Sequence, residues 1–433
     1  MIKTNYLKSI RKQLGLKQYD VTNGQITRNS ISHIENQKIS LTEKTIKLIQ
    51  DTINSHLIKE DHFIRLDYDD LFCEDRFKNK LLAEELYMEL ELLNNIDNAN
   101  LEILVNELNI LMAKWNFPVI KMKFNDLMGN HYYERFDYNT SQYYYNQAVS
   151  SAYRIGSLND ISRTVLKLMR ADIMTNSTSN SLELAKQLIS RKSEFELDTY
   201  LALLFNAALI FEKNSDYNNA LTNLREIENY SDEMDSEKLL DILLLKAICY
   251  ESLGDYEEAL KVYQDLLSSP LTLDDYGKKA NINCSTLALF IKQNNKQDII
   301  STIKHVDNSL SSIDCNNLYL PGVYLELGYG HQYLKEYNVA QDYFNKSINC
   351  AIKINEYYDL AEALASYLKV SEILQSPISH TTTLLILQLL SSKKLDSNDN
   401  TIFYYISYLE KNTAYEELRF FIDNIMKIRK ENI

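Results

Sequence analysis

Apolar residues recur at intervals of three and four along the first 55 positions, a spacing that predicts a group of short amphipathic helices. Leu7, Ile10 and Leu14 follow this spacing and predict the first helix. Gly15 can end that helix, because glycine adopts the left-handed backbone conformation of a helix stop without steric cost. A second short helix is predicted from Gln18 to about Thr22.

The third predicted helix follows an Asn-Gly turn at positions 23–24 and begins after Thr27, whose hydroxyl suits the N-cap position. Ile31 and Ile34 face the core of this segment, which turns the polar residues between them outward. A fourth helix is predicted from about Ser40 or Thr42. Four short helices with an outward polar face on the third are typical of a helix-turn-helix domain.

In a helix-turn-helix, the N-terminal residues of the second helix of the motif lie at base edges in the major groove. Arg28 can pair with guanine and Asn29 with adenine in bidentate fashion. Lys17 and Lys38 are placed to contact backbone phosphates, and Gln18 to contact a phosphate or a base edge. The predicted DNA-contacting residues are Lys17, Gln18, Thr27, Arg28, Asn29, Ser32, His33 and Lys38.

The segment GLKQYDV…TRNSISHIENQK resembles the helix-turn-helix of the lambda-repressor/Cro (Xre) class. By position, Gln18, Arg28, Asn29 and Ser32 fall where that class contacts DNA. The sequence departs from the class in two respects: Thr22 stands where a small alanine is usual, and the turn is about one residue short. The alternative is a four-helix knob that docks only on protein.

The body of the chain contains a repeat, and its clearest unit places Ala247, Tyr250, Gly254, Tyr256, Ala259, Tyr263 and Pro270 where tetratricopeptide repeats have small or aromatic residues. The same spacing recurs around Ser141, Ala220 and Ala340. These anchors and Ala259 lie 79, 39 and 81 residues apart, which indicates units of about forty residues. Two degenerate units are expected around Ala185 and Ile300.

The predicted fold class is therefore all-α: an N-terminal lambda-repressor-like helix-turn-helix domain, followed by a right-handed superhelix of tetratricopeptide-like helix pairs with a concave inner face. The scarcity of glycine (9) and proline (4) agrees with helices joined by short connections. We expect a DNA-binding domain at 1–58, a connection at 59–80 and a repeat domain at 81–433 that binds a peptide and dimerises. The connection is either a linker helix or a swapped arm.

The charge is unevenly distributed along the chain. Residues 1–50 carry nine basic and three acidic side chains, a net +6, whereas the whole chain has a net charge of −14, which leaves −20 for the remainder. The basic segment can attract phosphate while the acidic body repels it. There is no long apolar run for a membrane span and no secretion signal at the start, and the five scattered cysteines suit a reducing compartment, so a cytoplasmic protein is expected.

The combination of an Xre-type head with repeats of about forty residues resembles the RRNPP group of peptide-responsive quorum-sensing regulators from Gram-positive bacteria. The resemblance implies a cytoplasmic transcriptional regulator, expected to be a homodimer, that binds double-stranded DNA. It also implies that a short signalling peptide binds the concave face and alters DNA binding. Processes such as sporulation or virulence are expected by resemblance alone.

An extended peptide has unpaired backbone N–H and C=O groups, and an amide side chain can satisfy one of each. In the resembled group, asparagines on the first helix of each pair hold the peptide backbone, and Asn206 has the corresponding position. Tyrosines add apolar area with a polar tip. The predicted peptide-binding residues are Asn206, Glu212, Glu251, Tyr329, Gln332 and Tyr333.

No nucleotide-binding, zinc-protease or serine-hydrolase motif occurs, and the seven histidines are scattered, so no catalytic residue, metal site or cofactor is predicted. Related repeat proteins that lack a DNA-binding head act as phosphatases or block response regulators. The alternative function is therefore a protein-interaction adaptor that inhibits a signalling partner through the repeat face and has no DNA role.

Overall fold

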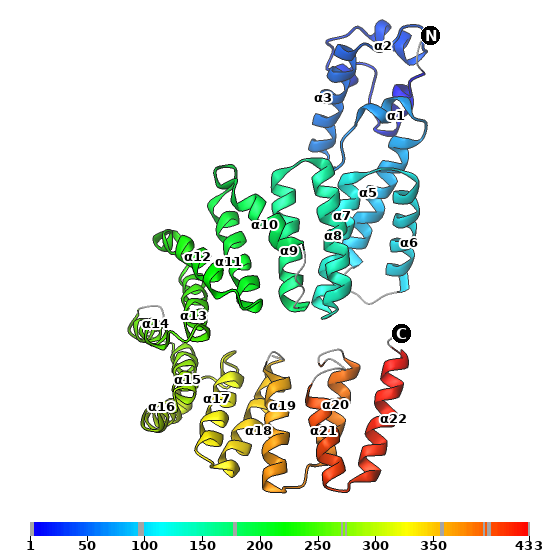
Figure 1. The fold of residues 1–433 in the computed structure, drawn as a ribbon. Coiled ribbons are helices and arrows are strands. Elements are labelled where there is room, and N and C mark those ends of the chain that lie inside the picture. Colours follow the sequence, from blue (N-terminus) through cyan, green and yellow to red (C-terminus); the bar gives the residue numbers. More distant parts are fainter. Residues whose placement is uncertain are drawn as a thin grey trace. The chain divides into compact units, whose positions relative to one another are not determined.

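The computed structural model describes residues 4–93, 99–175, 180–269, 272, 275–355, 359–392, 395 and 400–431. Every regular element within these residues is a helix, so the predicted all-α class is confirmed (Figure 1). Pro270, predicted at the end of one repeat, lies outside the described residues. The chain divides into two compact units, Met1–Thr199 and Tyr200–Ile433. This division falls inside the predicted repeat domain, and the boundaries near residues 58 and 80 stay predictions.

The first unit contains the predicted head and the first helix pairs. Its helices are α1 (Leu7–Gln13), the 3₁₀ turn η1 (Asp20–Thr22), α2 (Arg28–Glu35), α3 (Glu43–Lys59), α4 (Tyr68–Phe72), α5 (Arg76–Leu93), α6 (Ala99–Lys114), α7 (Pro118–Glu134), α8 (Tyr138–Ile155), α9 (Leu158–Thr175), α10 (Ser181–Ile189) and the 3₁₀ turn η2 (Lys192–Glu194).

The caps of the head helices are those predicted from the sequence. Gly15 follows α1 with a φ of +67°, and Asn23 and Gly24 form a turn with φ values of 47° and 74°. The Thr27 hydroxyl accepts a hydrogen bond from the Ser30 backbone N–H at 3.3 Å, and Thr42 caps α3 in the same way. Each cap satisfies a backbone N–H that has no partner within the helix.

The second helix of the head is shorter than predicted, because only the 3₁₀ turn Asp20–Thr22 forms. The Asp20 carboxylate accepts the Lys17 backbone N–H at 2.7 Å, and Asn23 then takes a left-handed conformation that ends the turn at once. Thr22, which replaces the usual alanine, is fully buried, and its hydroxyl has no hydrogen-bond partner within the described part of the chain.

The head and the first helix pairs share one apolar core. A continuous cluster of buried side chains runs from Leu7 and Ile31 in the head through Leu66 and Leu71 to Met128 on α7. The Tyr6 backbone N–H also donates to the carbonyl of Leu71 at 2.8 Å. Apolar burial is not directional, so this shared cluster fixes the head against α5 and α7 without a specific motif in the sequence.

The segment between α3 and α5 contains the short helix α4 and is bound to both neighbouring helices. Gln50 and Asn54 of α3 donate to the Leu66 carbonyl, and Asn54 Oδ1 accepts the Leu66 N–H at 2.7 Å. On the other side, the Glu84 carboxylate on α5 accepts the backbone N–H groups of Phe63 and Ile64. Both neighbouring helices therefore hold this segment by hydrogen bonds to its backbone.

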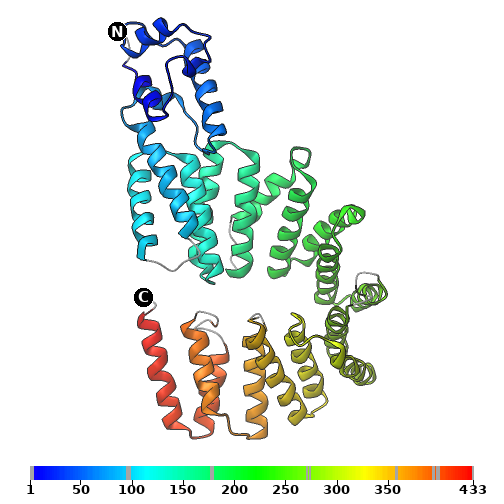
Figure 2. The same ribbon diagram turned by 180° about the vertical axis from the view of Figure 1, so that it is seen from behind.

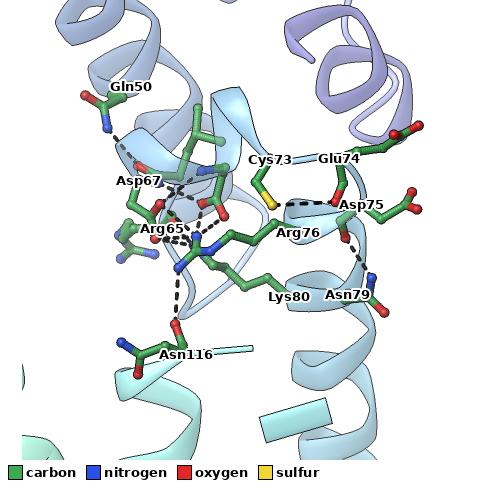
Figure 3. A network of polar contacts seen from close by, with 12 residues as sticks. Gln50, Arg65, Asp67, Cys73, Glu74, Asp75, Arg76, Asn79, Lys80 and Asn116 are labelled. Carbon is green, nitrogen blue, oxygen red and sulfur yellow. Dashed lines mark hydrogen bonds and ion pairs between the residues drawn. The ribbon is translucent and has the colours of Figure 1, made fainter. Parts of the chain in front are cut away.

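A cluster of four charged side chains lies where this segment enters α5 (Figure 3). Asp67 and Asp70 accept hydrogen bonds from Arg76 and Lys80, and the Asp70 side chain is completely buried. Arg76 also donates to the carbonyl of Asn116, which precedes α7, at 3.1 Å. Buried charges cost free energy unless they are paired and hydrogen-bonded, and here each has such partners.

The second unit is a further run of helix pairs. Its helices are α11 (Leu197–Lys213), α12 (Tyr217–Glu228), η3 (Ser231–Glu233), α13 (Ser236–Ser252), α14 (Tyr256–Ser268), α15 (Tyr276–Lys292), α16 (Lys296–Ser309), η4 (Leu310–Ser312), α17 (Leu320–Tyr333), α18 (Tyr337–Ile354), α19 (Leu360–Leu374), α20 (His380–Ser391), α21 (Asn400–Lys411) and α22 (Tyr415–Glu431).

Within each unit, successive helices lie side by side, as α7, α8 and α9 do in the first unit and α17, α18 and α19 do in the second (Figures 1 and 2). The predicted small residues Ala220, Ala259 and Ala340 are fully buried. Ser141 occupies the same position on α8, and its hydroxyl donates to the Gly129 carbonyl at 2.8 Å. The predicted repeat spacing is confirmed at these positions.

The two degenerate units expected around Ala185 and Ile300 are helical, as α10 and α16. Ala185 on α10 is fully buried. On α16 the buried residues are Ile299 and Ile303, and Ile300 is 47% exposed. Ile299 and Ile300 are adjacent on α16, and packing against α15 buries the first of them.

Within the described residues, no helix combines the length and the apolar character that crossing a bilayer requires.

Candidate functional sites

The head contains a polar network that links three of its elements. The Glu35 side chain is buried and accepts hydrogen bonds from Arg11 Nε at 2.6 Å and from Gln18 Nε2 at 2.8 Å. Gln18 Oε1 in turn accepts from Arg28 Nε at 3.3 Å. Arg11 and Glu35 therefore neutralise each other inside the head, and the chain Glu35–Gln18–Arg28 positions the first residue of α2.

The predicted DNA-contacting residues lie on or near the surface of the head. Lys17, Thr27, Arg28, Asn29, His33 and Lys38 are exposed, and Gln18 and Ser32 are partly buried. Because Thr27 caps α2, Arg28 and Asn29 occupy its first turn, as predicted. The terminal nitrogens of Arg28 and the side chain of Asn29 make no hydrogen bond to other described residues.

Two of the predicted DNA-contacting residues, Gln18 and Ser32, form hydrogen bonds within the head. Gln18 is engaged with both Glu35 and Arg28, so its amide orients Arg28. The carbonyl and hydroxyl of Ser32 accept hydrogen bonds from Asn36 at the end of α2. The sequence pattern did not indicate the buried Arg11–Glu35 pair. A basic and an acidic residue 24 positions apart carry no local signal of contact.

The second unit has a cavity of about 480 Å³ between α15 and α17. Three of the six predicted peptide-binding residues line it, namely Tyr329, Gln332 and Tyr333. The remaining lining residues are Ala288, Ile291, Lys292 and Glu326. The cavity thus combines apolar walls from aliphatic and aromatic side chains with a small number of polar groups, which is the usual composition of a ligand site.

Glu326 is the lining residue that the sequence analysis missed. Its carboxyl is closely surrounded by protein, although part of the residue faces the cavity, and no other described residue forms a hydrogen bond or ion pair with it. Burial, together with the nearby carboxylates of Glu362, Asp359 and Glu251, raises the pKa of Glu326 to about 8. Glu326 lies one helical turn before Tyr329 and could have been found by extending that helical phase.

The other polar groups around the cavity are mostly engaged with each other. Lys292 Nζ donates to Glu251 Oε1 at 2.7 Å, which brings a fourth predicted residue next to the lining. The Tyr329 hydroxyl donates to Glu362 Oε1 at 2.8 Å. Gln332 differs, because its Oε1 is buried and has no hydrogen-bond partner in the described structure. Neither Gln332 Oε1, which is buried, nor the Glu326 carboxyl therefore has a hydrogen-bond partner among the described residues.

The two remaining predicted residues lie on α11, outside the lining of this cavity. Asn206 is partly buried and makes no hydrogen bond to other described residues. Glu212 is also partly buried, and burial raises the pKa of its carboxyl. All six predicted residues lie on the first helix of a pair, as the repeat phase predicted, but the structure gathers only four of them around one cavity.

Comparison with known proteins finds a tetratricopeptide-repeat family model that matches residues 241–270, which span most of α13 and all of α14. A search of curated protein sequences finds no match. Among solved structures, apo NprR, a quorum sensor from B. thuringiensis, is similar with a TM-score of 0.45 and 14% identity over 81% of this chain and 99% of that chain.

A Rap protein complexed with competence and sporulation factor is similar with a TM-score of 0.43 and 14% identity over 90% of this chain and 93% of that chain. NprR in complex with its cognate peptide NprX has a TM-score of 0.41 and 18% identity over 77% and 99% of the respective chains.

Proposed function

We propose that this protein is a cytoplasmic DNA-binding transcriptional regulator, and that a short peptide bound by its second unit controls it. The observation that carries the proposal is the exposed polar surface at the N-terminus of α2. There Arg28 and Asn29 extend from a capped first turn, within a segment that has a net charge of +6. This combination of a basic surface with guanine- and adenine-pairing side chains suits reading of a duplex.

Arg28 is prepared for a base contact because Gln18 holds its Nε and leaves both terminal nitrogens available. Those two nitrogens form the fork that matches guanine O6 and N7. Lys17 and Lys38 are exposed on either side of α2 in the sequence and supply phosphate contacts, which fix the register of the domain on DNA. Two such heads in a homodimer would read half-sites about one helical turn, or a multiple of it, apart.

The second unit supplies the ligand site in this proposal. The cavity between α15 and α17 is large enough for one side chain of an extended peptide. Its tyrosines provide apolar contact, and the charged side chains of Glu326 and Lys292 provide polar contacts. A peptide changes DNA binding only if it binds two conformations of the protein with different affinities. The cavity therefore supports the peptide-binding part of the proposal.

The test of the DNA-binding proposal is selection of duplexes from a random pool by the full-length chain, followed by affinity measurement over a range of salt concentrations. We expect the native protein to enrich one sequence and its affinity to fall steeply with salt, because phosphate contacts release counterions. Arg28→Ala should lower affinity for that sequence about 10- to 100-fold, since a bidentate base contact contributes about 1–3 kcal/mol. Its fold should be unchanged by circular dichroism.

The matched control is Lys59→Ala, which removes the same charge at the far end of α3 and should leave sequence selection unchanged. If Arg28→Ala enriched the same sequence as the native protein, α2 would not be the reading helix. If the native chain retained no duplex even at very low salt, the DNA role would be rejected. The adaptor function would then be the better account.

A further inference from the structure

The cysteines of the second unit have two different environments. Cys249 and Cys284 are buried, and burial raises the pKa of Cys249 to about 12 and that of Cys284 in the same direction. These two thiols therefore stay protonated and pack as small apolar side chains. Cys315, in contrast, is exposed in the turn between η4 and α17, and Cys350 is partly exposed on α18. Only this second pair can meet a reagent dissolved in water.

Cys315 and Cys350 are 35 positions apart in the sequence and are brought together by the packing of α17 on α18 (Figure 1). The Ser347 hydroxyl on α18 donates to the Pro321 carbonyl at 2.8 Å, which holds the start of α17 against the second half of α18. Lys353 Nζ donates to Cys315 Sγ at 3.2 Å. Lys353 follows Cys350 by three residues, and side chains at this spacing are neighbours on a helix surface. Two thiols and one ammonium group thus form a cluster.

We propose that this cluster is a site of reversible oxidation by peroxides, at which Cys315 reacts first and Cys350 completes a disulfide. Neither DNA binding nor peptide binding requires the pair, so the site adds a second input to the protein. Cys315 lies in a turn outside the helices, and its backbone can adjust to the Cα separation of about 4.4–6.8 Å that a disulfide needs.

The reaction has two steps. The Cys315 thiolate attacks one oxygen of hydrogen peroxide, so that an S–O bond forms, the O–O bond breaks, and hydroxide leaves and takes a proton from water. The Cys350 sulfur then attacks the sulfenic acid, the S–S bond forms, the S–O bond breaks, and the departing hydroxide leaves as water with the Cys350 proton. Two thiols are oxidised and one peroxide is reduced to water. The new bond joins the turn before α17 to α18.

The surroundings of the two sulfurs assign these roles. Cys315 is the more exposed, and the ammonium group of Lys353 stabilises negative charge on its sulfur, which is the setting of reactive thiols. The hydrogen bond to Cys315 raises the pKa of Lys353, and the nearby carboxylate of Asp314 acts in the same direction, so the lysine stays charged. Burial raises the pKa of Cys350, Lys353 opposes the rise, and the charge of Cys315 adds to it. Cys350 therefore remains a thiol until the sulfenic acid forms beside it.

The experiment exposes the reduced full-length protein to hydrogen peroxide, blocks the remaining thiols by alkylation in denaturant and maps the peptides by mass spectrometry without reduction. We expect one disulfide-linked peptide pair that contains Cys315 and Cys350, and its loss after dithiothreitol treatment. Cys249 and Cys284 should be recovered alkylated. Cys73 is the internal reference, because it is partly exposed and its thiol donates only weakly, to the Glu74 carbonyl at 3.8 Å.

Three variants separate the roles within the cluster. Cys350→Ser should leave Cys315 as a sulfenic acid that dimedone labels, and Cys315→Ser should leave Cys350 reduced over the same exposure. Lys353→Gln should slow the oxidation of Cys315 about two- to fivefold, the scale of one solvent-exposed charge contact. The matched control Lys296→Gln makes the same charge change at the other end of α16 and should leave the rate unchanged.

Two results would overturn the assignment. The first is oxidation of Cys315 no faster than that of Cys73, which would show that its surroundings do not make it reactive. The second is oxidation of Cys315 to sulfinic or sulfonic acid, or to disulfides between chains, while Cys350 of the native protein stays reduced. Both results are read from the native protein, so they do not depend on the folding of a variant.

Discussion

At the scale of single residues, Glu326 has the clearest consequence for stability. Its pKa of about 8 lies above the ordinary value of 4.5, so the native chain keeps a proton that the unfolded chain releases between these two values. The native state is then relatively favoured at low pH. Its stability falls as pH rises from about 4.5 to 8, because the unfolded carboxylate is solvated and the buried one is not.

We therefore predict that Glu326→Gln stabilises the ligand-free protein increasingly as pH rises. Glutamine has the shape of the protonated acid and cannot ionise, so the gain should be small near pH 5 and about 1–3 kcal/mol near pH 8.5, which allows for the solvent that enters the cavity. Urea unfolding of both chains at several pH values measures it. A difference that stayed constant with pH would show that Glu326 does not titrate in this range.

Around the cavity, repeat positions can be predicted from the sequence, whereas contacts between repeats cannot. Glu251, Lys292 and Tyr333 are separated by 41 residues each, so they hold equivalent positions in successive repeats, and two of them, Glu251 and Tyr333, are predicted peptide-binding residues. The pairing of Glu251 with Lys292 needs two neighbouring first helices to lie in contact, which repeat length alone does not establish. The burial of the Glu326 carboxyl also depends on how the helices of the second unit pack, so the repeat spacing does not predict it.

At the scale of elements, the contact between the two helices of a pair depends on glycine in two places. An ideal Cβ added to Gly328 on α17 would lie 2.4 Å from Phe344 Cε1 on α18. The same arrangement occurs in the first unit between Gly129 and Tyr145, also at 2.4 Å. In both pairs, an aromatic ring packs directly on the backbone of the facing helix at the glycine. The ring therefore fills the space between the two helices, and the facing helix contributes no side chain there.

Gly328→Ala is accordingly expected to destabilise the second unit by about 1–3 kcal/mol, although alanine is the better helix former by about 1 kcal/mol. Phe344→Leu should also destabilise it, because a smaller side chain leaves space in the core. The double variant should lose less than the sum, since leucine makes room for the added methyl group. Thermal unfolding of the four chains measures the coupling, and strict additivity would contradict the contact.

The helices that are defined by local capping residues were predicted well. The elements that depend on competing hydrogen bonds or on packing were predicted less accurately. Thr27 and Thr42 define α2 and α3 because capping is local. The turn at Asp20–Thr22 depends on a hydrogen bond from the Lys17 backbone to Asp20, which competes with a longer helix. On α16, apolar residues at both 299 and 300 satisfy the pattern, and only packing decides between them.

At the scale of the whole molecule, the predicted sites are in different units. The head belongs to the first, and the cavity with all its charged neighbours belongs to the second. Within one chain, the proposed control of DNA binding by a peptide would have to pass through the first helix pairs before it reaches α2. This route exists only if the head moves with those pairs, and not as an independent domain on a flexible tether.

The shared apolar core and the cluster of Asp67, Asp70, Arg76 and Lys80 indicate that the head and α5 behave as one body. Asp70→Asn tests this, because it leaves Arg76 and Lys80 with one carboxylate in a buried setting. Breaking a buried ion pair typically costs about 3–5 kcal/mol. We expect faster amide hydrogen exchange throughout the first unit, including α2 and α3, and unchanged exchange in α17 and α18.

The matched control is Asp69→Asn, the neighbouring and exposed position on α4, which removes the same charge without touching the cluster. It should leave exchange unchanged in both units. If Asp70→Asn accelerated exchange in α4 and α5 but left α2 and α3 protected, the head would be an independent module. A ligand signal could then reach DNA only through the relative arrangement of two complete chains in a dimer, because the covalent connection would not transmit it.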